Sequence, residues 1–91
     1  MTTLVLEPPT QEQQAEYRVA AAKKAVDCHA EKALAWRREN ILGYDTANSR
    51  LIVRAGLDLP QVMTRLATLD RESTRLAAEL NAALKVWSSY R

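Results

Sequence analysis

Residues 59–90, LPQVMTRLATLDRESTRLAAELNAALKVWSSY, contain a line of positions that recur at alternating steps of three and four residues. This spacing brings the whole line to one side of a helix, as in the heptad repeat of a coiled coil. We call the line the seam of this segment. Its members are Leu59, Val62, Leu66, Leu69, Ser73, Leu76, Leu80, Ala83, Trp87 and Tyr90. Because one helix cannot bury its own apolar stripe, the seam predicts a second helix packed against it.

Residues 10–42 supply that second helix, with a seam of smaller side chains. Its members are Ala15, Val19, Ala22, Val26, His29, Ala33, Trp36 and Asn40. Thr10 stands three residues before Gln13, the spacing of a capping box at a helix start. Gly43 follows as a helix stop. Two helices of similar length, one with small and one with large seam residues, predict an all-α fold: a long antiparallel helical hairpin that resembles a coiled coil.

The second helix is predicted over residues 59–90. Asp58 stands three residues before Gln61, again with capping-box spacing, and Pro60 falls in the first turn, where a missing N–H costs little. Between the two long helices, Asp45 and Gly56 bracket residues 46–55 as a cap and a stop, so we predict a short middle helix there. The alternative is a strand through residues 51–53, whose β-branched residues favour it, but no partner strand is evident.

The composition supports one small helical domain. The chain has 91 residues with two glycines, three prolines and no phenylalanine, which is typical of long helices. Residues 10–91 form the predicted domain. Residues 1–9, which end in Pro8 and Pro9, form a predicted flexible arm, since prolines forbid helix there. As an alternative, the arm could add Leu4, Val5 and Leu6 as a strand to a partner's sheet edge.

Cysteine and hydropathy patterns favour a soluble cytoplasmic protein. Cys28 is the only cysteine and His29 the only histidine, which excludes an intramolecular disulfide and a zinc site built from Cys and His of one chain. The first residues lack the basic region of a secretory signal, and no apolar run has the length needed to span a bilayer. We therefore expect no cofactor, no metal and no membrane association.

The sequence also argues against an enzyme, and we predict no catalytic residues. Cys28 and His29 are adjacent, but neighbouring helix residues point about 100 degrees apart and cannot form a nucleophile and base pair. Glu-x-x-His motifs and glycine-rich loops are missing. Because His29 and Ser73 sit at similar heights on opposing seams, we expect them to form a hydrogen bond and to fix register or oligomeric state.

The apolar stripes are wider than a strict seam, which predicts a binding surface for protein. A protein partner or a second copy of the chain would cover it, and two hairpins would make a four-helix bundle. We therefore expect a protein interaction module that works as an adaptor, an assembly co-chaperone or an inhibitor, by analogy with small phage and secretion-system proteins. The candidate contact residues are Leu34, Trp36, Ile41, Met63, Leu84, Trp87 and Tyr90.

Nucleic-acid binding is the alternative function, because arginines are frequent in the middle of the chain. They are Arg37, Arg38, Arg50, Arg54, Arg65, Arg71 and Arg75. Acidic residues are interleaved among them, and the totals of 13 basic and 11 acidic residues nearly balance. A solvated face with paired charges is the preferred interpretation.

Overall fold

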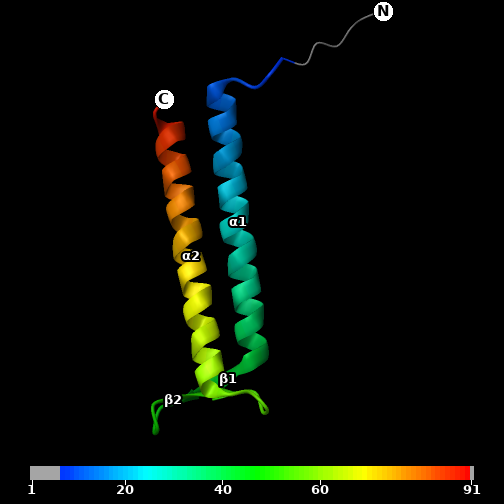
Figure 1. Cartoon of the computed structure of the whole chain (residues 1–91), viewed down its shortest axis with the longest axis vertical. Helices are drawn as coiled ribbons and strands as arrows, with labels where there is room; N and C mark the ends of the chain where they lie inside the picture. Colours follow the sequence, from blue (N-terminus) through cyan, green and yellow to red (C-terminus); the bar gives the residue numbers. More distant parts are fainter. Residues whose placement is uncertain (1–6, 91) are drawn as a thin grey trace, which may run out of the picture.

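The computed structural model describes residues 7–90, and within this range two long helices are joined by a β-hairpin (Figure 1). In chain order the elements are α1 (Gln11–Asn40), β1 (Ile41–Asp45), β2 (Arg50–Val53) and α2 (Leu59–Ser88). The helices lie antiparallel and side by side, with the β-hairpin across one end as a foot. The molecule measures 71 × 34 × 16 Å. The expected helical hairpin is therefore confirmed, and it is one helix layer thick.

The start of α1 follows its sequence signal closely. The Thr10 hydroxyl accepts a hydrogen bond from the Gln13 backbone N–H at 3.2 Å, and the Gln13 side chain accepts one from the Thr10 N–H at 3.0 Å. These two bonds complete the predicted capping box. The start of α2 differs, because the Asp58 side chain makes no capping bond although Pro60 stands in the first turn as expected. The Asp58 carbonyl begins the helical ladder instead, accepting from the Val62 N–H at 3.1 Å.

The two seams face each other along the rod. On α2 the buried positions recur every seven residues: Val62, Leu69, Leu76 and Ala83. On α1 all eight seam positions are buried or half-buried. The seam of α2 has two exposed members, Ser73 and Tyr90. Within residues 7–90 only six side chains reach the buried class, the four above with Ala15 and Asn40, so the core is a single line of contacts.

The predicted middle helix over residues 46–55 is wrong, because this segment belongs to the β-hairpin. β1 and β2 pair antiparallel, with Tyr44 opposite Leu51 and Asp45 opposite Arg50, and the register shifts between Ile41 and Gly43. The partner strand that seemed to be missing is Ile41–Asp45, which the sequence interpretation had divided between the end of the first helix and its stop. α1 accordingly ends at Asn40, and Gly43 lies within a strand rather than ending a helix.

Asp45 shapes the turn between the strands. One carboxylate oxygen accepts hydrogen bonds from the backbone N–H groups of Ala47 and Asn48, at 3.1 and 3.3 Å, and the other accepts from the Asn48 side chain at 2.7 Å. The bond from the Asn48 side chain, followed by the bond from its backbone, lowers the pKa of the Asp45 carboxyl from its ordinary value. Asp45 therefore caps a tight turn, not a helix, and Ser49 closes that turn at a left-handed φ of 51°.

Asn40 connects the foot to the helices. Its side-chain amide donates to the Trp36 carbonyl at 2.8 Å, and its own carbonyl accepts from the Arg54 N–H at 2.9 Å. Asn40 is only 6% exposed. A buried amide that satisfies the end of α1 and holds the segment after β2 fixes the hairpin across the base of the rod.

Candidate interaction faces

The seam of the rod is bordered by two broad faces, and we call the first the Leu34 face. A hollow of about 340 Å³ on this side is lined by Leu34 and Arg37 of α1 and by Asp70 and Ser73 of α2. Arg37 and Asp70 form an ion pair at 3.3 Å across it. Three further α2 residues continue the stripe of Asp70 at steps of seven and so share its side of the helix. They are Met63, Ala77 and Leu84.

Large apolar side chains are uncovered on the Leu34 face. Leu34 is 49% exposed, Met63 52% and Leu84 36%. A folded chain exposes scattered apolar residues routinely, but residues aligned along one side of a thin rod form a surface suited to another helix. The sequence-predicted contact residues Leu34, Met63 and Leu84 are therefore brought to one side.

The other predicted contact residues lie elsewhere. Tyr90 is exposed near the end of α2. Trp36, Ile41 and Trp87 are half-buried, Trp36 close to the foot and Trp87 at the opposite end of the rod. These three residues contribute to the fold itself and present only their edges to solvent.

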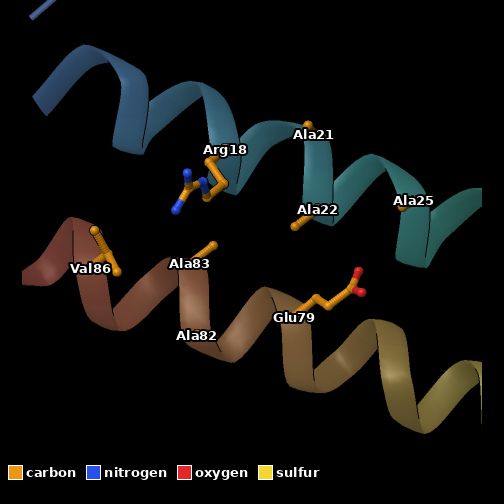
Figure 2. A pocket seen from close by; sticks show the side chains of 8 residues that line it. All are labelled: Arg18, Ala21, Ala22, Ala25, Glu79, Ala82, Ala83 and Val86. Carbon is orange, nitrogen blue, oxygen red and sulfur yellow. The ribbon is translucent and has the colours of Figure 1, made fainter. Parts of the chain in front are cut away.

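The opposite side carries a long hollow, and we call it the groove face. One hollow of about 470 Å³ and another of about 440 Å³ share Ala25, and a third of about 140 Å³ shares Arg18 and Val86 with the first. Figure 2 shows Arg18 and Glu79 extending from opposite helices toward the space between them, with Ala22 and Ala83 below. The floor of the first hollow is made of small residues: Ala21, Ala22, Ala25, Ala82 and Ala83.

Charges are sorted between the two edges of the groove face. On α1 the residues at steps of seven from Arg18 are Ala25, Lys32 and Glu39, and on α2 the corresponding series is Arg65, Glu72, Glu79 and Val86. Glu72 and Glu79 both pair with Arg75 of their own helix, at 3.5 and 2.9 Å. In the described range no lysine or arginine of α1 lies within 4.0 Å of either glutamate. The centre of the groove is thus basic on its α1 edge and acidic on its α2 edge.

His29 links the helices near the middle of the rod. Its Nε2 lies 3.0 Å from the Leu69 carbonyl oxygen. Since a carbonyl only accepts, Nε2 carries the hydrogen and donates it. The second ring nitrogen, Nδ1, lies 4.0 Å from a carboxylate oxygen of Glu72. The expected bond between His29 and Ser73 is not formed among the described residues, because the ring reaches the α2 backbone one turn before Ser73.

Residues with reactive side chains do not combine into a catalytic arrangement in the part of the chain that the structure covers. Cys28 is exposed and borders the groove, whereas His29 turns into the seam. Between residues 7 and 90 no group of three or more His, Cys, Asp or Glu side chains is placed to hold a metal ion. The contacts between the two faces and other molecules are therefore the chemistry that this geometry offers.

The foot is an exposed apolar region that the sequence interpretation missed. Leu42 is 66% exposed, Tyr44 56% and Ile52 46%. They were overlooked because β1 was assigned to a helix end and its stop. The signal was the run Ile41–Tyr44, whose branched and aromatic residues favour a strand.

The seven candidate arginines are spread over the molecule. Arg37 borders the Leu34 face and Arg65 the groove face, while Arg50 lies on β2. Arg37 and Arg75 are paired with carboxylates, and Arg71 donates to the Thr68 hydroxyl at 3.3 Å. The structure does not gather these arginines into one continuous basic patch.

Two further findings limit what the chain resembles and how it can sit in a cell. No helix among residues 7–90 is both long enough and apolar enough to cross a membrane. The arm predicted for residues 1–9 lies largely outside the described range, which begins at Glu7, and so does its apolar run Leu4–Leu6. No family model, curated protein or solved structure matches the chain.

Proposed function

We propose that this protein is a small, non-enzymatic interaction module that binds another protein through the Leu34 face. The observation that carries the proposal is the alignment of Leu34, Met63 and Leu84, each about one-third to one-half exposed, on one side of a rod 16 Å thick. Side chains of this kind stabilise a complex when a partner removes them from water.

The spacing of the stripe on α2 suggests the partner's shape. Met63, Ala77 and Leu84 follow one line of the helix, with the Arg37–Asp70 pair near the centre. An amphipathic helix with apolar residues at steps of three, four and seven matches such a line. The exposed ion pair contributes little to affinity and instead orients the partner.

The area available sets the scale of the affinity. Fully burying a leucine or methionine side chain contributes roughly 1.5–3 kcal/mol, so covering the exposed part of each of the three contributes about 1 kcal/mol. Together they contribute on the order of 3 kcal/mol before the costs of association. A stable complex therefore also uses neighbouring groups such as the edge of Trp36 and the ion pair. Adaptors, assembly co-chaperones and inhibitors of larger machines all act by this kind of surface burial, and the exposed thiol of Cys28 suits a reducing cytoplasm.

A charge placed on the stripe tests the proposal. Met63→Asp introduces a carboxylate on the Leu34 face, and Tyr17→Asp is the matched control. Tyr17 is 62% exposed and lies two helix positions from both Ala15 and Val19, so it points away from the seam. The partner is captured with the full-length protein, purified, and titrated against each variant by fluorescence anisotropy.

We expect Met63→Asp to weaken binding at least tenfold, about 1.4 kcal/mol, and Tyr17→Asp to leave it unchanged. Equal effects of the two variants would contradict the proposal. Retention of nucleic acid that is released at moderate salt, in place of a protein, would support the alternative function.

A further inference from the structure

We propose that the groove face binds a second copy of this chain, with the two rods parallel and related by a two-fold axis that runs along the groove. α1 of each copy then lies on α2 of the other. The result is a four-helix bundle with both feet at the same end. This surface is opposite the Leu34 face, so the inference is independent of the proposed function.

The exposed area of the chain indicates that a large surface awaits cover. The chain exposes 7548 Å², whereas a compact monomer of 10.2 kDa exposes about 5,300 Å². A standard interface buries about 800 Å² of each partner, well within the excess of roughly 2,200 Å². Two helices of 30 residues with a single line of buried contacts gain a third and fourth helix by this association.

The groove admits a helix closely. Its floor consists of Ala22, Ala25 and Ala83, whose short side chains let a neighbouring backbone approach, and Val86 offers an apolar contact at one end. Its hollows continue along much of the helix pair through shared lining residues. Packed helix axes lie about 8–10 Å apart, and small residues permit the shorter end of that range.

The levels of the charged residues along the rod decide how a second copy fits. His29 contacts both Leu69 and Glu72, so these residues mark the same level. Counting from there at about 1.5 Å per residue, Lys32 lies about 4.5 Å from the level of Glu72, and Arg18 lies about 6 Å from the level of Glu79. By the same count Glu39 lies about 4.5 Å from the level of Arg65. All three offsets are within the reach of long side chains.

The parallel arrangement joins opposite charges at each of these levels. It places Arg18 beside the partner's Glu79, Lys32 beside the partner's Glu72, and Glu39 beside the partner's Arg65. The two-fold axis makes each pair twice, so six complementary contacts flank an apolar floor. Such contacts set orientation and select the correct partner.

The antiparallel arrangement joins like charges instead. A two-fold axis across the groove at the level of Ala25 lays α1 on the partner's α1 and brings Arg18 opposite the partner's Lys32, seven residues on either side of that level. The same axis brings Glu72 opposite the partner's Glu79. Like charges in contact disfavour this pairing. The charge pattern therefore selects rods that point the same way.

Charge exchange between two variants tests the pairing. Arg18→Glu alone and Glu79→Arg alone place like charges at two symmetric contacts of the dimer. An equimolar mixture restores both contacts in the heterodimer, because each variant supplies the charge that the other has lost. We expect each variant alone to dimerise at least tenfold more weakly than the native chain by sedimentation equilibrium. We expect the mixture to form a heterodimer, identified by native mass spectrometry, within about threefold of native affinity.

Three further variants make the outcome decisive. The double variant Arg18→Glu/Glu79→Arg carries the pair with exchanged signs and should dimerise like the native chain, even if Glu79→Arg alone loses helix by circular dichroism. Lys24→Glu reverses a charge on the outer side of α1, and Met63→Asp adds one on the Leu34 face; both should leave the dimer intact. A native chain that stays monomeric, single variants that dimerise normally, or a mixture without heterodimer would overturn the inference.

Discussion

Replacing Leu69 by alanine tests whether stability resides in the single line of contacts between the helices. Leu69 is 5% exposed, so nearly all of its side chain is removed from water. The substitution deletes three carbon atoms, which at about 0.8 kcal/mol each amounts to about 2.4 kcal/mol. Leu69 lines hollows on both faces of the rod, so water fills the vacated space and no sealed cavity adds to the cost. We therefore expect a loss of about 2–2.5 kcal/mol.

Leu34→Ala is the matched control, because it deletes the same atoms from a side chain that is 49% exposed. Its expected cost is about half as large, roughly 1.2 kcal/mol. Urea unfolding is followed by far-ultraviolet circular dichroism at one fixed protein concentration, because self-association adds concentration-dependent stability. For a domain of this size, Leu69→Ala should lower Tm by on the order of 10–20 °C. Equal losses for the two variants, or a loss below about 1 kcal/mol for Leu69→Ala, would refute the reasoning.

Three further predictions concern the ends of the elements. Thr10→Ala removes one half of the capping box and should cost about 1 kcal/mol in urea unfolding, whereas Thr10→Ser should cost little; equal costs would argue against the cap. Ser49→Gly relieves a left-handed φ of 51° and should raise stability by roughly 0.5–1 kcal/mol, and a lower Tm would contradict this. The bonds to ionised Asp45 stabilise the turn fully above the ordinary carboxyl pKa of about 3.9 and are lost as the pH falls through the lowered pKa, so the Asn48 amide resonance should titrate below about pH 3.9. Asp45→Asn should abolish that titration, and a midpoint above about 3.9 would count against the turn geometry.

The helices were predictable because their signals are local and repeated. Steps of three and four residues along both segments specify one apolar side for each helix, and Thr10 with Gln13 marks a start by chemistry confined to four residues. The antiparallel pairing followed from two seams of similar length with a short connector. Burial of seven-step positions such as Leu69 and Leu76 is the outcome that this spacing implies.

The connector was not predictable from local signals, because its decisive contact is with another segment. Asp45 at the head of a polar run suits a helix cap and a β-turn equally well. The choice depended on whether a partner strand existed, and that strand, Ile41–Asp45, had been assigned to a helix end. Once β1 is recognised, the pairing of Tyr44 with Leu51 and the turn at Asn48 follow from it.

The candidate faces were predictable in part. Spacing identified Leu34, Met63 and Leu84 as flanking residues, but it could not say that Trp36 and Trp87 would be half-buried. Spacing also placed His29 in the seam without specifying the level and rotation that bring its ring to the Leu69 carbonyl. The seven-step charge series of the groove are visible in the sequence, yet their meaning depends on which edges the antiparallel pair sets side by side.

The direction of the second copy links the fold most directly to its proposed association, and one distance measures it. Thr46→Cys, in a chain whose native thiol is removed by Cys28→Ser, places a spin label on the exposed turn of the foot. Double electron–electron resonance of the dimer should give a distance on the scale of the 34 Å width of the molecule, because parallel rods bring both feet to one end. A distance approaching the 71 Å length, or no dipolar coupling between copies, would contradict the groove-to-groove pairing.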